Sequence, residues 1–142
     1  MSPPPVSPPP VIEVVAAVVV AADGRTLLVR KRGTAAYMNP GGKPEPGESH
    51  RDALVRELQE EIGLLVDPAA LEPLGSFETD AANEPGHALL AHVFVLDLAS
   101  TEHRVAAEIE ESRWVEPGAP GALPLAPLAA EHLLPWLVRG RR

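Results

Sequence analysis

The 142-residue chain contains no cysteine. Disulfide bonds, thiol nucleophiles and zinc sites built from cysteine are therefore excluded. Basic residues are scarce as well, because 12 Lys and Arg stand against 20 Asp and Glu, which gives a net charge of −8. This balance argues against nucleic acid polymers as partners. A small anionic substrate remains compatible with it, provided that local cations or a metal receive the negative charge.

Long hydrophobic runs are also missing. The longest apolar run, residues 11–22, has 12 residues and includes Glu13, which is too short to span a membrane. No segment rich in Lys or Arg precedes it, so a signal peptide is not expected, and the cytoplasm is the expected location. With 45% hydrophobic residues, the chain predicts one globular domain over residues 11–142. Residues 1–10 contain six prolines and are expected to form a disordered tail.

Five glutamates lie in one segment, residues 42–64, with the sequence GKPEPGESHRDALVRELQEEIGL. Three of its glutamates, Glu57, Glu60 and Glu61, follow the spacing i, i+3, i+4, which places them on one face of a helix. Like charges so close repel one another, and Arg56 offsets only part of that repulsion. The spacing therefore predicts a site for a hard divalent cation such as Mg²⁺. The alternative is a solvated acidic helix face.

Local signals bound this helix. Ser49, followed three residues later by Asp52, is typical of a helix start, and Gly63 is typical of a helix end. The apolar residues between them occupy the side away from most of the acids and can dock on a core: Leu54, Val55, Leu58 and Ile62. The preceding Pro-Gly-Gly, residues 40–42, is expected to form a turn where the backbone approaches a ligand. The pattern thus predicts carboxylates pointing outward from a rigid support.

The whole segment reads G-x5-E-x7-R-E-L-x-E-E-I-G-L and resembles the Nudix box at every defined position. The resemblance is to the Nudix hydrolases of the MutT-like kind. It implies an α/β fold, a Nudix-type α/β/α sandwich with a mixed β-sheet and the box as a loop–helix–loop. It further implies a Mg²⁺-dependent hydrolase, with Mn²⁺ as a substitute, that cleaves the pyrophosphate linkage of nucleoside diphosphates joined to another group.

The resemblance also assigns roles to residues. Glu57, Glu60 and Glu61 resemble the metal ligands, with Glu57 or a neighbour helping to activate water, and the Gly41 carbonyl resembles a further ligand. Arg56 resembles the residue that orients the carboxylates. Gly42 and Glu48 resemble residues that support the site. Glu108 is the candidate for a further acid from outside the box. Glu108 is chosen because residues 108–115 resemble the family segment that carries an extra catalytic, metal-binding acid, and Glu111 in the same segment is expected to be structural.

Cations and histidines outside the box give weaker signals. Arg30 and Arg32 alternate with Lys31 at the end of a predicted strand, so the two arginines are expected to share one side. Two interpretations stand: they bind substrate phosphates, or they form a charged strand end. The five histidines lie at positions 50, 87, 92, 103 and 132. No two have metal-ligand spacing, so each is predicted to be a surface or core residue.

The remaining pattern predicts strands at residues 11–22, 26–30, 71–77, 88–98 and 113–116, polar loops at 78–87 and 101–112, and an amphipathic helix at 126–138. The family resemblance leaves two classes of substrate open. The first is nucleoside triphosphates, including the oxidised ones that some members of the family remove. The second is nucleotide sugars or dinucleotides. The segment after the box lacks the proline or tyrosine typical of ADP-ribose and diadenosine polyphosphate members. A non-catalytic nucleotide-sensing module is the alternative, and a homodimer is one expected assembly.

Overall fold

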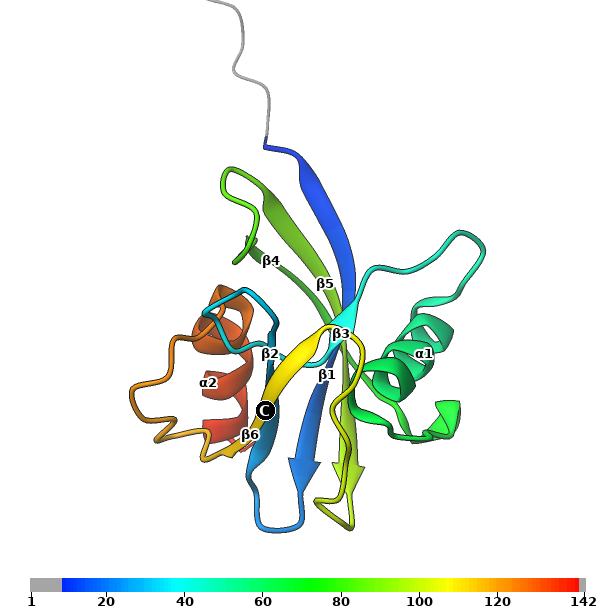
Figure 1. The fold of residues 1–142 in the computed structure, drawn as a ribbon, viewed down its shortest axis with the longest axis vertical. Coiled ribbons are helices and arrows are strands. Elements are labelled where there is room, and N and C mark those ends of the chain that lie inside the picture. The colour runs from blue at the N-terminus through cyan, green and yellow to red at the C-terminus, as the bar shows by residue number, and fades with distance from the viewer. Residues whose placement is uncertain (1–8, 141–142) are drawn as a thin grey trace, which may run out of the picture.

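The computed structural model describes residues 9–140 (Figure 1). Its strands and helices follow in the order β1 Val11–Ala21, β2 Thr26–Lys31, β3 Gly41–Gly42, α1 His50–Ile62, η1 Pro68–Ala70, β4 Glu72–Asp80, β5 Ala88–Leu98, β6 Ile109–Val115, η2 Leu128–Leu133 and α2 Leu134–Val138. Most of the predicted tail, residues 1–8, lies outside the described residues. Pro10 is among the described residues, and its carbonyl accepts a hydrogen bond of 2.8 Å from the Ala88 amide.

The sheet runs in the order β4-β5-β1-β2-β6, and β3 pairs with β1. β1 and β5 are parallel along their whole lengths, whereas the other pairs are antiparallel. From Val15 onward every residue of β1 is buried, because β1 lies in the middle of the sheet and alternate side chains enter the cores on its two faces. The prediction of a strand buried on both faces is confirmed from Val15 onward, whereas residues 11–14 are exposed or only partly buried.

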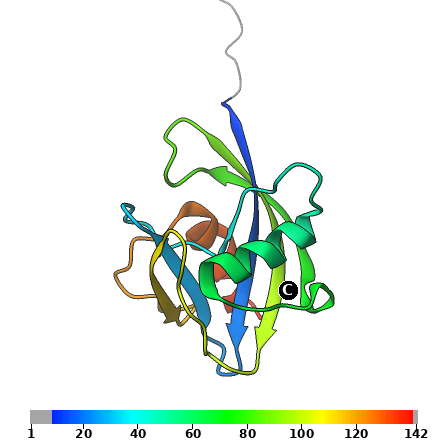
Figure 2. The same cartoon turned by 45° about the vertical axis from the view of Figure 1, so that its right-hand side comes forward.

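Helical segments cover both faces of the sheet (Figures 1 and 2). α1 packs on the face that carries Val15, Ala17 and Val19. η2 and α2 pack on the opposite face, where alternate β1 side chains meet Leu128 and Leu133. The predicted α/β/α sandwich with a mixed sheet is thus confirmed. Over the residues that the structure describes, no helix combines the length and the apolar character that a membrane crossing needs.

The two outermost strands are longer than predicted. β4 continues to Asp80 because Thr79 and Asp80 pair with residues of β5. β6 begins at Ile109, four residues before the predicted start, because it pairs with β2 from Lys31 onward. Both segments are polar, so they read as loops in the sequence. An edge strand tolerates polar side chains, and its extent is set by the neighbouring strand.

The predicted helix at residues 126–138 is present in extent but is not one regular α-helix. η2 is π-helical, since the Leu134 amide bonds to the Ala129 carbonyl five residues earlier. α2 follows directly with Pro135 in its first turn. Proline has no N–H to donate to the carbonyl four residues before it, so the regular pattern is interrupted at this position.

Candidate active site

α1 begins and ends where the sequence predicted. The Ser49 side chain accepts a hydrogen bond of 3.1 Å from the Asp52 amide. Gly63 ends the helix in the left-handed conformation at φ 67° and donates its N–H to the Gln59 carbonyl. Leu54 and Leu58 are fully buried against the sheet. Capping at both ends and packing on one side hold the helix in place, so the opposite side is a rigid support for acidic residues.

Residues 41–42 do not form the predicted turn. They form the two-residue strand β3, which pairs with Val15 and Ala16 of β1. A Cβ atom on Gly41 would overlap the Val15 carbonyl oxygen, and one on Gly42 would lie 2.5 Å from the Glu57 carboxyl carbon. At Gly41 the overlap would be with the backbone of β1, so only glycine fits there, whereas at Gly42 it would be with the end of a flexible side chain.

Arg56 is the centre of a network of carboxylates. Its guanidinium donates to both oxygens of Glu48, at 2.8 and 2.9 Å, and to Glu57 at 2.9 Å and Glu60 at 3.3 Å. Hydrogen bonds from Arg56 and from the Glu45 amide lower the pKa of Glu48 to about 2. Paired contacts of this planar group fix orientation as well as charge. Arg56 therefore holds three acids of the segment in fixed positions.

Glu61 points into the protein rather than outward. The residue as a whole is only 2% exposed. Its Oε1 atom accepts a hydrogen bond of 2.9 Å from the Gly41 amide. Burial raises the pKa of Glu61 to about 8, with the charges of Glu57 and Glu108 adding to the effect. The prediction that all three helix acids face outward is wrong for this residue, because position 61 lies where the helix meets β3.

Glu57 is also largely buried, with a side chain 14% exposed. Burial raises its pKa, and the hydrogen bond from Arg56 opposes that rise only in part. Glu60 differs, since its side chain is 52% exposed. Glu57 and Glu61 are thus two desolvated carboxyl groups whose ionised forms lack sufficient positive charge around them, an arrangement that favours the binding of a cation.

Glu108 lies next to this group of acids, immediately before β6. Its carboxylate is 3.4 Å from the Lys31 ammonium, and its side chain is 65% exposed. Glu57, Lys31 and Glu108 line a cleft of about 610 Å³, together with Gly41 and apolar residues from both sides. The tertiary structure thus brings an acid from outside the segment to the cleft that Glu57 lines, whereas Glu60 and Glu61 are not among its lining residues.

Arg30 and Arg32 do not lie with them. Arg30 donates to Glu111 at 3.0 and 3.2 Å, and Arg32 to Glu110 at 3.1 Å. Of the three neighbouring cations only Lys31 is among the residues lining the cleft. Sequence reasoning missed Lys31, although the alternation that it used puts Lys31 on the side opposite to the arginines. Phosphate binding by Arg30 and Arg32 stays a prediction that this placement does not favour.

Glu111 is occupied by structural contacts. Besides Arg30, it accepts a hydrogen bond of 2.7 Å from the Tyr37 hydroxyl. These hydrogen bonds, first from Tyr37 and then from Arg30, lower the pKa of Glu111. They link β6 to the loop that enters β3, in keeping with the structural role expected for this residue.

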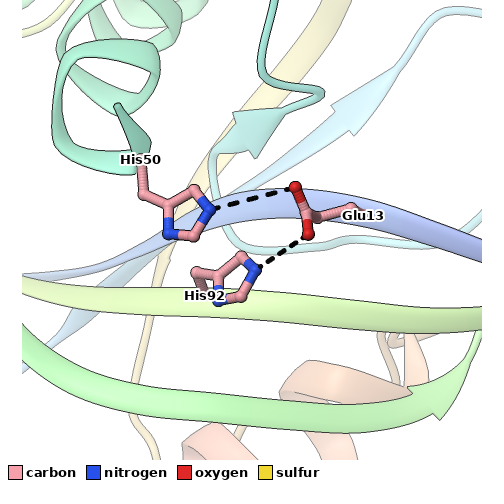
Figure 3. A group of neighbouring side chains, drawn as sticks. All are labelled: Glu13, His50 and His92. Carbon is pink, nitrogen blue, oxygen red and sulfur yellow. Dashed lines mark ion pairs between the residues drawn. The ribbon is translucent and has the colours of Figure 1, made fainter. Parts of the chain in front are cut away.

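Two of the histidines do meet, contrary to the expectation from spacing. His50 and His92 lie beside Glu13, and one ligand atom from each of the three residues falls within 4.8 Å of the others (Figure 3). Sequence spacing reveals ligands that share one helix or loop. These three residues come from α1, β5 and β1, so only the tertiary structure could show their proximity.

The chain is similar to known proteins in sequence and in fold. A family model described as the NUDIX domain matches residues 11–137. The CTP pyrophosphohydrolase of Escherichia coli is 34% identical over 111 residues, which cover 74% of this chain and 76% of that protein.

Solved structures agree. The solution structure of the E. coli ORF135 protein superposes with a TM-score of 0.70 at 31% identity, covering 98% of each chain. The NUDIX domain of Shewanella oneidensis NrtR, crystallised with ADP ribose, has a TM-score of 0.73 at 17% identity and covers 92% of this chain and 87% of that one. At this identity the NrtR likeness shows the fold alone.

Proposed function

The chain belongs to the Nudix family and is a Nudix pyrophosphohydrolase, and from this premise we propose that it uses Mg²⁺ to hydrolyse nucleoside diphosphates linked to a further group. One observation carries the proposal: the desolvated carboxyl group of Glu57 lines a cleft together with Glu108, and the buried carboxyl group of Glu61 is close enough for the charges of both to raise its pKa. A non-catalytic nucleotide-sensing module would not require this arrangement of acids.

The donor atoms fit a hard cation. The proposed ligands are the carboxylates of Glu57, Glu60, Glu61 and Glu108 with the Gly41 carbonyl, and all of them are oxygen atoms, as Mg²⁺ and Mn²⁺ prefer. The raised pKa values of Glu57 and Glu61 support this assignment, because a neighbouring cation stabilises the ionised form of a buried acid. Glu48 and Gly42 support the site, Glu48 by holding Arg56 and Gly42 by leaving room for the Glu57 carboxylate.

When bound, the metal would neutralise phosphate charge and make a coordinated water more acidic. The chain's own residues supply the rest. Arg56 keeps Glu57 and Glu60 oriented, and the Lys31 ammonium, which lines the cleft, would contact phosphate oxygens. Glu108 is exposed in the same cleft and would act either as a metal ligand or as the base that takes the proton from the attacking water. A general base of this kind contributes about a hundred- to ten-thousand-fold in rate.

The cleft also offers a place for the nucleoside. Its volume of about 610 Å³ lies within the range of about 300–1,000 Å³ typical of small-molecule sites. Apolar side chains line the end formed by β1, β5 and η2: Ile12, Val14, Leu89 and Leu128. The similarity to a CTP pyrophosphohydrolase supports a nucleoside triphosphate as the substrate. Nucleotide sugars and dinucleotides remain the second class.

A substrate panel tests the proposal. The purified chain with Mg²⁺ is offered CTP and the other triphosphates, oxidised triphosphates, ADP-ribose, nucleotide sugars and dinucleoside polyphosphates, and the products are separated. We expect release of a nucleoside monophosphate from at least one compound, loss of that turnover in Glu60→Gln, and its retention in the exposed control Glu110→Gln. Hydrolysis that is absent throughout, or equal in parent and Glu60→Gln, would refute the proposal. Homodimer formation and a cytoplasmic location stay predictions.

A further inference from the structure

Glu13, His50 and His92 form a compact group on the α1 side of the sheet, outside the box acids (Figure 3). We propose that these three residues bind a divalent transition metal of the zinc type. The Nε2 atom of His92 is 3.3 Å from Oε2 of Glu13, and Nε2 of His50 is 3.9 Å from Oε1 of the same carboxylate. Two imidazoles and one carboxylate are a common three-ligand set for such metals.

The fold explains why the three meet. His92 on β5 is paired with Val15 of the parallel strand β1, and Glu13 lies two residues before Val15 on the same side of the sheet. His50 is the first residue of α1, the helix that packs on this face. The group therefore sits where the start of α1 crosses the two central parallel strands, at the margin of the core.

His92 is oriented as a metal ligand would be. Its Nδ1 lies 2.8 Å from the Ser76 hydroxyl on β4. Its Nε2 is almost fully shielded from solvent, yet it has no hydrogen-bond partner among the described residues. If Nδ1 donates its proton to Ser76, Nε2 carries a free lone pair and lies 3.3 Å from Oε2 of Glu13. A second hydrogen bond that fixes the ring in this way accompanies nearly all metal-ligating histidines, and a bound metal would satisfy the buried nitrogen.

The distances come close to those of a bound metal. With metal–ligand bonds of about 2.0–2.2 Å in a tetrahedron, ligand atoms lie about 3.3–3.6 Å apart. The His92–Glu13 pair is already at 3.3 Å. The His50 ring stacks on His92 with centroids 3.8 Å apart, so it has to tilt away for both nitrogens to reach one ion. A side chain that is 44% exposed at a helix start can make this movement.

The site would be distinct from the acids of the box, although His50 itself belongs to the box segment. His50 precedes Glu57 by seven residues on α1, which is about 10 Å along the helix axis. Its nitrogen donors favour Zn²⁺, Ni²⁺ or Cu²⁺, whereas the oxygen donors around Glu57 suit Mg²⁺. Three protein ligands leave a fourth tetrahedral position for water, and the exposure of Glu13 and His50 leaves the group open to ions from solvent.

Titration of the full chain with Zn²⁺ in the presence of excess Mg²⁺ tests the proposal. Calorimetry gives stoichiometry and affinity for the parent, His50→Gln, His92→Gln and the control His87→Gln, which alters a histidine in the loop between β4 and β5. We expect the parent and His87→Gln to bind one equivalent of Zn²⁺ that is lost, or weakened more than about a hundred-fold, in the other two. Co²⁺ should give a visible absorption band in the parent that disappears in the same two variants.

Ser76→Ala provides an independent arm, since it leaves all three ligands in place. It should weaken Zn²⁺ binding by about ten- to a hundred-fold, and circular dichroism checks that each variant is folded. His50→Gln alters an exposed side chain, so it decides the matter even if His92→Gln fails to fold. Zn²⁺ binding by His50→Gln and Ser76→Ala that equals the parent's would overturn the proposal. Hydrolysis with Mg²⁺ alone should persist in His50→Gln, which separates this test from that of the proposed function.

Discussion

Replacing Glu61 by glutamine should stabilise the metal-free protein while abolishing most of its turnover. The glutamine side chain retains an oxygen that can accept the Gly41 amide hydrogen bond, and it has nearly the same size. The substitution removes an ionisable carboxyl group from a residue that is only 2% exposed. The substitution therefore isolates the free energy of keeping a carboxyl group in this position.

The size of the effect follows from the pKa. Burial raises the pKa of Glu61 from its usual 4.5 to about 8 in the folded protein. Stability from this group is complete below pH 4.5, where the unfolded form is also protonated, and is lost as the pH rises toward 8. Each pH unit over which only the unfolded form ionises costs about 1.4 kcal/mol. At pH 7 the parent is therefore destabilised by about 3 kcal/mol relative to Glu61→Gln.

Urea unfolding in EDTA at pH 5 and pH 7 measures this difference. We expect Glu61→Gln to exceed the parent by about 3 kcal/mol at pH 7 and by less than about 1 kcal/mol at pH 5. The matched control is Glu60→Gln, whose side chain is 52% exposed, and its gain from relieved repulsion should stay within a few tenths of a kcal/mol, roughly, at either pH. A Glu61→Gln protein no more stable than the parent at pH 7 would refute the reasoning.

The gain in stability on addition of Mg²⁺ provides a second measurement at the same site. At a concentration of one hundred times its dissociation constant, a ligand that binds only the folded state adds about 2.7 kcal/mol of stability. The parent should show such a gain and Glu61→Gln much less of it. A melting temperature of the parent that does not respond to Mg²⁺ would remove the metal site from the proposed function.

Other changes have equally definite outcomes. Glu108→Gln should lower kcat by at least about a hundred-fold with KM changed far less, whereas the control Glu110→Gln should keep near-parent kinetics. If both variants have the same kinetics, Glu108 is a surface acid without a role in turnover. Gly42→Ala should fold normally but displace the Glu57 carboxylate and reduce turnover by about a hundred-fold, as steady-state kinetics with a thermal melt would show. Deleting residues 1–8 should leave turnover and Tm unchanged, since a proline-rich terminus buries little surface.

Much of the fold could be predicted because its signals are local. The start and end of α1 depend on side chains within a few residues of each terminus, Ser49 and Gly63. β1 and β5 are apolar enough that few positions other than the middle of a sheet would suit them. The spacing of Glu57, Glu60 and Glu61 likewise needs only the helical repeat. In each case the sequence contains the physical cause within one segment, so the prediction did not depend on how the segments pack.

Other features depend on contacts between segments that are far apart in the sequence, so only the tertiary structure determines them. The helical repeat puts Glu61 on a face with other acids, but β3 covers that face and so buries the carboxyl group. Alternation separates Lys31 from Arg30, but only the pairing of β2 with β6 shows which side faces the cleft and which is occupied by Glu111.

The group of Glu13, His50 and His92 is the clearest case, since its members are separated by 37 and 42 positions in the sequence. Local propensity determines what a segment becomes, because the interactions that form a helix turn or a strand span only a few residues. Side chains from different segments meet only through strand register and helix docking, which depend on burying apolar surface contributed by the whole chain. The ligand set on β1, α1 and β5 was therefore fixed by the parallel pairing of two strands and by the helix that packs across them.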